Sequence, residues 1–180
     1  MGDSKKSLVV FDFDHTIVDS NTDLSVRDMI DGEVPDEVEA IYSDRCWNEY
    51  MNAIFHILHT QSVTVDDMTR VLERSPLTNG MQELLQYLAE NKHMYSVIII
   101  SDSNVLFIDI LLRYYGLSEV VYRVYSNPAS VDSDGQLRIR YYHHQTGCDI
   151  SSHNMCKGKY PPTPESVQSA SIMIQPLAGL

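Results

Sequence analysis

A short apolar run that ends in aspartates constrains what this chain can fold into more than any other feature. Residues 8–11 read LVVF, a composition typical of a strand buried on both faces of a parallel sheet. Asp12 and Asp14 come immediately after this run. Because ligands of open α/β sheets bind at the carboxyl ends of the strands, the sequence predicts that both carboxylates lie beside a ligand site.

Two carboxylates at this spacing favour one kind of chemistry. They concentrate negative charge, which calls for a hard cation such as Mg²⁺. With that cation bound, Asp12 could attack phosphorus and form an aspartyl-phosphate, while Asp14 could protonate the leaving oxygen and then deprotonate the attacking water. An acidic turn after a core strand is the alternative. A calcium loop is disfavoured, because the glycine and closing glutamate of an EF-hand are missing at the required offsets.

The segment DFDHTIVD, residues 12–19, resembles the first motif of the haloacid dehalogenase-type phosphatases, an Asp-x-Asp-x-Thr pattern after an apolar strand. The resemblance implies that Asp12 is the nucleophile and Asp14 the general acid/base. It also implies that Mg²⁺ is held by the Asp12 carboxylate and the backbone carbonyl of Asp14.

Helical periodicity dominates the stretch after this motif. Apolar residues recur at helical spacing over residues 24–61, and Thr64 with Asp67 predicts a capping box that opens a helix to about residue 73. A helical insertion at this place could be a lid over a site, or it could simply fill the core. The family resemblance favours the lid, because this family carries a helical cap here.

A strand–helix–strand pattern occupies the second half of the chain. Residues 95–100 and 120–125 are predicted strands, and an apolar helix over 105–115 that Gly116 stops lies between them. The pattern predicts an α/β fold, a Rossmann-like parallel sheet of the haloacid dehalogenase type with an inserted helical cap. The expected units are a core (1–20 and 77–159), a cap (21–76) and an atypical proline-rich tail (160–180).

The second predicted strand also ends in polar residues. Ser101 could hydrogen-bond a phosphoryl oxygen with the help of N–H groups at the next helix start, or Ser101 to Ser103 could only cap that helix. The segment IIISDSN, residues 98–104, resembles the second motif of the superfamily. The resemblance implies that Ser101 orients the phosphoryl group.

Four segments taken together carry a closer resemblance. They are FDFDHTIVDSNTD (11–23), CWNEYM (46–51), IIISDSN (98–104) and HNMCKGK (153–159). In this order they are similar to the phosphoethanolamine/phosphocholine phosphatase and pyridoxal phosphate phosphatase family.

This closer resemblance implies three further site residues. Asp23 and Asp102 would bind the non-phosphate end of the substrate, and carboxylates suit an ammonium or a polar ring group there. Lys157 would contact the nucleophile and the phosphoryl oxygens. Taken without the resemblance, Asp23 could be an N-cap, Asp102 a charge that favours the helix dipole, and Lys157 a solvated lysine in a loop.

Histidines and cysteines gather between residues 143 and 156, after a hairpin predicted at Asp134-Gly135. Their spacing fits no common zinc pattern, so buried thiols and surface histidines are favoured over a zinc-binding interaction module. The residues concerned are His143, His144, Cys148, His153 and Cys156.

The tail departs from the family pattern. Residues 160–180 hold four of the seven prolines and lack the GD-x-x-ND-like motif that supplies a third metal carboxylate in the family. Such a loss should cost at least roughly 10–100-fold in metal affinity or activity. We therefore expect a truncated or alternatively spliced product, or a gene model with a wrong 3′ exon, in which the strand at 8–11 has an exposed apolar edge.

The composition of the chain argues against some classes of binding partner. A length of 180 residues predicts one domain with an inserted subdomain. The net charge of −12, with 13 unclustered basic residues, argues against nucleic acid and anionic membranes. The start of the chain lacks a signal-peptide pattern, and three cysteines give no disulfide framework, so we expect the cytosol.

The sequence thus predicts a phosphatase that hydrolyses a small phosphomonoester with Mg²⁺ through an aspartyl-phosphate. Pyridoxal 5′-phosphate and an amino-alcohol phosphate are the expected substrates, and neither is preferred. A catalytically impaired phosphate-binding or regulatory chain is the alternative. The predicted catalytic residues are Asp12, Asp14, Ser101 and Lys157, the substrate-binding residues Asp23 and Asp102, and the metal ligands Asp12 and Asp14.

Overall fold

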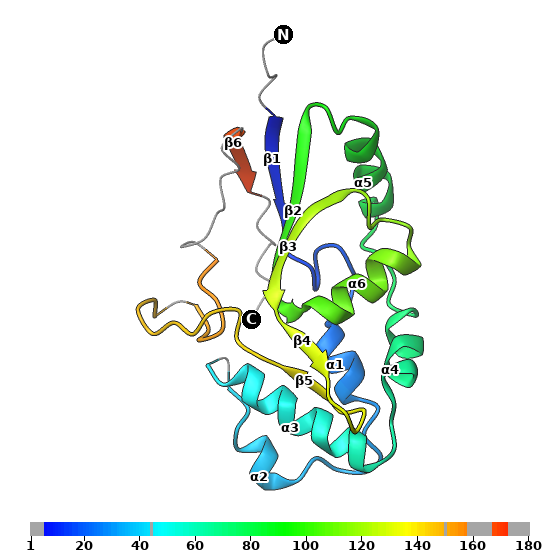
Figure 1. The fold of residues 1–180 in the computed structure, drawn as a ribbon, viewed down its shortest axis with the longest axis vertical. Helices are drawn as coiled ribbons and strands as arrows, with labels where there is room; N and C mark the ends of the chain where they lie inside the picture. Colours follow the sequence, from blue (N-terminus) through cyan, green and yellow to red (C-terminus); the bar gives the residue numbers. More distant parts are fainter. Residues whose placement is uncertain (1–5, 44, 150, 158–166, 173–180) are drawn as a thin grey trace.

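A parallel sheet forms the centre of the molecule (Figure 1). The computed structural model describes residues 6–43, 45–149 and 151–157, together with the backbone of residues 167–172. Neighbouring strands are parallel throughout the order β3-β2-β1-β6, which confirms the predicted Rossmann-like α/β fold. The strands are β1 (Lys6–Phe11), β2 (Tyr95–Asn104), β3 (Val121–Asn127) and β6 (Val167–Ile172).

The two central strands are buried on both faces, as their apolar composition predicts. Val10 lies opposite Ile98 and Phe11 opposite Ile99 in the β1–β2 register. Phe11 and Ile99 belong to the main core, whereas Val10 and Ile98 pack on the other face with Met155. The carboxyl ends of β1 and β2 are therefore fixed side by side.

The helices alternate with these strands. The main core unites the buried faces of the helices with one face of the sheet, and it includes Leu85 of α5 and Phe107 of α6. No helix among the described residues is both long and apolar enough to cross a membrane. The helices are α1 (Thr22–Arg27), α2 (Asp36–Glu39), α3 (Trp47–Thr60), α4 (Val65–Leu72), α5 (Met81–Glu90) and α6 (Val105–Tyr114).

Helices α1 to α4 lie beyond the carboxyl ends of β1 and β2 (Figure 1). The helical pattern predicted over residues 24–61 takes the form of three separate helices, α1, α2 and α3. Gly32 adopts a left-handed φ of +93°, and Pro35 disfavours helical backbone in the residue before it. The capping box of α4 is confirmed: Thr64 N–H donates to Asp67 Oδ2 at 3.0 Å, and Asp67 N–H donates to Thr64 Oγ1 at 3.2 Å.

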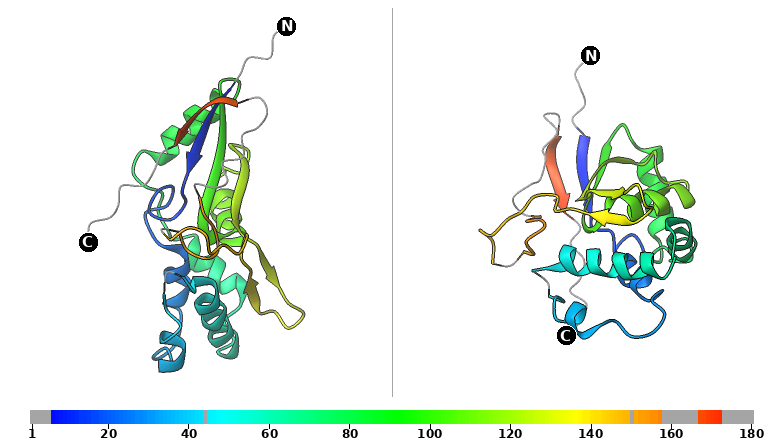
Figure 2. Two further views of the ribbon diagram at one scale, coloured as in Figure 1. Left: turned by 90° about the vertical axis from the view of Figure 1, so that its left-hand side faces the viewer. Right: turned by 60° about the horizontal axis from the view of Figure 1, so that its bottom comes forward.

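The predicted hairpin is confirmed and connects the sheet with α3. Strands β4 (Ala129–Val131) and β5 (Leu137–Ile139) pair antiparallel around Gly135, whose φ is +91°. Asn52 of α3 donates from Nδ2 to the Ile139 carbonyl at 2.9 Å, and Ile139 N–H donates to Asn52 Oδ1 at 3.0 Å. The right-hand view of Figure 2 shows the hairpin beside α3.

The expectation of an exposed apolar edge on β1 is wrong. Strand β6 pairs with β1 in parallel, with Leu8 opposite Ala170 and Val10 opposite Ile172. The expectation rests on the absence of the family's GD-x-x-ND-like motif, which follows the strand beside β1 in that family. Residues 167–172 lack that motif but contain no proline, and they form the neighbouring strand.

Candidate active site

The predicted residues converge where β1 and β2 end. Asp12 and Asp14 follow β1, and β2 continues past the predicted end at residue 100 through Ser101 and Asp102 to Asn104. The parallel register of the two strands places these side chains at one edge of the sheet. The strand topology therefore agrees with the motifs, which predict the site at the carboxyl ends of β1 and β2.

Asp12 is bound on both carboxylate oxygens. The Phe13 N–H donates to Oδ1 at 2.7 Å, and the Lys157 ammonium donates to Oδ2 at 2.7 Å. Lys157 Nζ also lies 3.0 Å from Asp102 Oδ2, so one ammonium joins two carboxylates. Burial lowers the pKa of Lys157, but the charges of Asp102 and Asp12 outweigh burial and raise it overall.

Asp14 is oriented by Thr22, which precedes Asp23 on α1. The Thr22 N–H donates to Asp14 Oδ1 and the Thr22 hydroxyl donates to Asp14 Oδ2, both at 3.2 Å. Burial raises the pKa of Asp14 to about 8, and the negative charges of Asp23 and Asp12 act in the same direction. The hydrogen bonds from Thr22 oppose this rise.

Asp23 is 2% exposed and holds two neutral donors. Trp47 Nε1–H donates to its Oδ2 at 2.6 Å, and the Asn104 amide donates to its Oδ1 at 3.5 Å. Burial raises the pKa of Asp23 to about 6, and the two donors limit the rise. The N-cap alternative for Asp23 is wrong, because the side chain of Asn21 caps α1 by accepting from the Leu24 N–H at 2.9 Å.

Ser101 is 1% exposed and accepts from the Ser103 N–H at 3.2 Å. The helix-capping alternative for Ser101 and Ser103 is also wrong. Asn104 is the N-cap of α6, and its side chain accepts from the Phe107 N–H at 3.1 Å. Ser103 Oγ lies 2.9 Å from the Thr22 hydroxyl, so a chain of hydroxyls connects β2 with Asp14.

A cavity of about 540 Å³ opens at these strand ends. Four of the six predicted residues line it, and the other two contact its wall: Asp12 through Lys157, and Ser101 through Ser103. The lining residues are Asp14, Asp23, Asp102 and Lys157, together with Asn21, Leu24, Tyr42, Trp47, Ser103, Ser151, Ser152, Asn154 and Met155.

Sequence reasoning gave no role to Thr22 or to the aromatic wall. Trp47 packs against Tyr42 and Tyr50, with ring centroids 5.7 Å from each. Trp47 lies in the CWNEYM segment that supports the family resemblance, and that was the available signal for it. No comparable signal marked Thr22, because its role depends on a hydrogen bond between separate elements.

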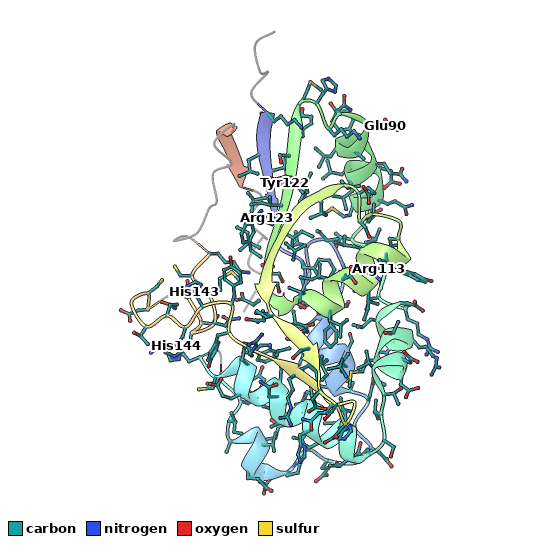
Figure 3. The ribbon with its side chains drawn as sticks, in the orientation of Figure 1. Glu90, Arg113, Tyr122, Arg123, His143 and His144 are labelled. Atoms are coloured by element: carbon teal, nitrogen blue, oxygen red, sulfur yellow. The ribbon has the colours of Figure 1, made fainter. Side chains whose placement is uncertain are left out.

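The loop after β5 carries Lys157 to the site. Buried Gln145 donates from Nε2 to the Ser152 carbonyl at 2.6 Å, and the amide of Asn154 donates to Asn127 Oδ1 at 3.4 Å. Figure 3 places His143 and His144 on this loop. Among the described residues, no three or more His, Cys, Asp or Glu side chains are grouped so that they could hold a metal ion, which leaves the zinc alternative without support.

The donors at the site suit a hard cation. Mg²⁺ is usually held by one or two carboxylates, with waters and substrate phosphate oxygens completing its shell. The Asp12 carboxylate and the backbone carbonyl of Asp14 are two such oxygen donors, close together in the chain after β1. Among the described residues of the site, the Lys157 ammonium pairs with Asp12 and Asp102, while Asp14 and Asp23 line the same cavity, so carboxylates outnumber the ammonium. The residues present therefore fit Mg²⁺.

Comparison with known proteins identifies the family. The chain is 40% identical over 153 residues to pyridoxal phosphate phosphatase PHOSPHO2 of Mus musculus, which covers 84% of this chain and 63% of that protein. It is 38% identical over 153 residues to phosphoethanolamine/phosphocholine phosphatase of Homo sapiens, covering 84% and 57%. The chain thus spans less than two thirds of the length of these relatives.

The fold comparison agrees with the sequence comparison. A solved structure described as "Phospho-Aspartyl Intermediate Analogue of Phosphoserine phosphatase" matches with a TM-score of 0.54 and 19% identity, over 77% of this chain and 66% of that one. Residues 7–162 match the family described as "Putative Phosphatase". The chain therefore belongs to this haloacid dehalogenase-like family, together with the pyridoxal phosphate and phosphoethanolamine/phosphocholine phosphatases.

Proposed function

We propose that this chain hydrolyses a small phosphomonoester with Asp12 as the nucleophile. The observation that carries the proposal is the Lys157 ammonium, which lies 2.7 Å from Asp12 Oδ2 at the end of β1, beside the cavity. A fixed positive charge next to an attacking carboxylate stabilises the negative phosphoryl oxygens that arrive there. Family membership supports the same reaction class.

The residues divide the reaction in the following way. An Asp12 oxygen forms a bond to phosphorus as the ester oxygen leaves, and Asp14 gives that oxygen a proton. Asp14 then takes a proton from water, the water oxygen bonds to phosphorus, and Asp12 is released with inorganic phosphate. Ser101, at the end of β2, is proposed to orient the phosphoryl group by hydrogen bonding.

We propose Mg²⁺ as the cofactor, held by the Asp12 carboxylate and the backbone carbonyl of Asp14. When bound, it neutralises charge on the phosphoryl oxygens and polarises phosphorus towards attack. Thr22 fixes the Asp14 side chain beside the cavity with two hydrogen bonds, which supports the proposed acid/base role of that side chain.

The proposed substrates are pyridoxal 5′-phosphate and amino-alcohol phosphates. The relatives' names support them, and a cavity of about 540 Å³ is in the range of small-molecule sites. Asp23 and Asp102 line the cavity, where they would face an ammonium or a polar ring group. The odd count of three cysteines gives no disulfide framework, which supports the proposal of a reducing cytosolic location.

The experiment is a phosphate-release assay on the full chain with and without Mg²⁺. The substrates are pyridoxal 5′-phosphate, phosphoethanolamine and p-nitrophenyl phosphate. We expect Mg²⁺-dependent release that Asp12→Asn abolishes and that chelation removes. Asp19→Asn is the matched control, because Asp19 is an exposed carboxylate a few residues on and its loss should leave the rate unchanged.

A folded wild-type chain that releases no phosphate with any of these substrates would overturn the proposal. A chain that binds inorganic phosphate without turnover would then fit the binding or regulatory alternative. Circular dichroism of each variant separates loss of chemistry from loss of fold.

A further inference from the structure

Asp102 has a different partner from the other carboxylate predicted to bind substrate. Its Oδ2 lies 3.0 Å from Lys157 Nζ, whereas Asp23 is bound by the neutral side chains of Trp47 and Asn104. A carboxylate that is already paired with an ammonium attracts a second cation less strongly, since the field of the pair largely cancels at a distance. Substrate recognition is therefore not the only use that the geometry suggests for Asp102.

Lys157 needs an anchor. Its side chain is 36% exposed, and a lysine has a flexible four-carbon stem with three rotatable donors. One carboxylate alone would leave the ammonium free to pivot around Asp12. Asp102, at 3.0 Å, supplies a second fixed point opposite the Asp12 contact at 2.7 Å.

Asp102 is itself held in place. The Asn127 amide of β3 donates to the Asp102 backbone carbonyl at 2.6 Å, and Asn127 is fully buried. The Ser152 hydroxyl, which also contacts Asn154 Oδ1, lies 3.4 Å from Asp102 Oδ1. Asp102 is therefore held near the carboxyl end of β2, and its carboxylate also contacts the loop that contains Lys157.

We propose that Asp102 is a positioning residue that holds the Lys157 ammonium against Asp12. The inference rests on the proposed phosphatase function. It makes Asp102 important for the turnover of every phosphomonoester, with or without a positive charge on the alcohol part.

The first test is steady-state kinetics of Asp102→Asn on a cationic ester, phosphoethanolamine, and on an ester without a cation, p-nitrophenyl phosphate. We expect kcat to fall by about 10- to 100-fold for both, the range for misplacing a catalytic group or losing its orienting partner. Asp102→Glu should recover part of the rate. Asp109→Asn, which removes a carboxylate paired with Arg113 at 3.0 Å on α6, is the matched control and should leave the rate unchanged.

The second test is whether Asp102 acts through Lys157. In a Lys157→Met background, Asp102→Asn should cause no further loss of kcat. Losses that multiply in the double variant would overturn the inference. So would a rise in KM for phosphoethanolamine alone with kcat unchanged, because that result assigns Asp102 to substrate recognition only.

A binding measurement separates this inference from the proposed function. Inorganic phosphate is titrated into the wild type, Asp102→Asn, Lys157→Met and the double variant by calorimetry in the presence of Mg²⁺. If Asp102 acted only through its own negative charge, Asp102→Asn would bind inorganic phosphate more tightly than the wild type. If Asp102 positions Lys157, Asp102→Asn should bind phosphate more weakly. Weaker, non-additive binding without turnover would refute the phosphatase proposal alone, and stronger binding in Asp102→Asn would refute the inference alone.

Discussion

Two carboxylates that share one cavity, Asp23 and Asp102, occupy opposite electrostatic surroundings. Asp23 lies on α1, is 2% exposed and holds neutral donors. Asp102 lies on β2, its side chain is 44% exposed, and it pairs with the Lys157 ammonium. Family resemblance gives both residues the same role, but their surroundings favour different ones.

The difference shows how the same chemical group is put to different uses. A carboxylate buried among neutral donors bears a desolvation cost that those donors offset only in part, and burial raises the Asp23 pKa to about 6. A cation brought by a substrate would relieve that cost. A carboxylate that is already paired with a cation, as Asp102 is with Lys157, is stabilised less by a cation of the substrate. Its more important effect is to hold the cation of the pair in place. The predictions below test this contrast between the two sides of the cavity.

The largest effect is expected on the Lys157 side. Lys157→Met removes the ammonium that bridges Asp12 and Asp102, and we expect kcat to fall about 10³-fold, since one lost electrostatic donor costs roughly 10²–10³. The measurement is kcat with p-nitrophenyl phosphate, and Lys92→Met at an exposed position is the control. A fall of less than threefold would mean that the bridge is a surface ion pair with no part in turnover.

The next effect concerns stability on the Asp23 side. Because the folded pKa of Asp23 is raised from 3.8 to about 6, its favourable contribution is present below pH 3.8 and is lost as the pH rises through about 6. Asp23→Asn removes this dependence. The stability of the variant relative to wild type should therefore increase by about 2 to 3 kcal/mol between pH 4 and pH 7.5.

Urea unfolding of both proteins at the two pH values measures this change. Asp19→Asn, at an exposed carboxylate, should show no such increase relative to wild type. If the stability of Asp23→Asn relative to wild type did not change with pH, ionisation of Asp23 would not destabilise the folded chain. The contrast between Asp23 and Asp102 would then disappear.

A smaller effect is expected when the donor to Asp23 is removed. Trp47→Phe keeps an aromatic ring but loses the Nε1–H bond to Asp23 Oδ2 at 2.6 Å. We expect a loss of about 2 kcal/mol at pH 7.5, since hydrogen bonds to charged groups are worth roughly 1.5–3 kcal/mol. The loss should shrink at pH 5, where Asp23 is protonated in the folded chain. Tyr42→Phe, in the same aromatic cluster, should behave alike at both pH values.

Most of the fold could be predicted because its signals are local. Apolar runs predicted β1 to β3, the Asp-Gly turn predicted the hairpin, and Thr64 with Asp67 predicted the start of α4. Strand β6 could not be predicted, because β1 supplies the hydrogen-bonding partner for a segment with weak local preference. Likewise, Asn104 caps α6 in place of Ser101 because β2 continues four residues further than its apolar run.

The candidate site divides in the same way. Asp12, Asp14 and Lys157 were predicted from motifs, and the structure brings all three together. The Asp102–Lys157 pair and the link through Thr22 depend on contacts between residues far apart in the chain. The spacing of residues in the sequence does not predict such contacts, so only the structure shows which residues pair with each charged side chain.

The smallest effect is expected at Thr22, whose hydroxyl lies between Asp14 and Ser103 and so connects α1 with β2. Thr22→Val keeps the backbone N–H bond to Asp14 but removes the hydroxyl that contacts Asp14 Oδ2 and Ser103 Oγ. We expect a stability loss of about 1 kcal/mol, typical of one hydrogen bond, and less than a tenfold fall in kcat. Thr22→Ser retains the hydroxyl and should restore both quantities in urea unfolding and phosphate release. If serine restored neither, the methyl packing of this fully buried residue, and not its hydroxyl, would connect β2 to Asp14.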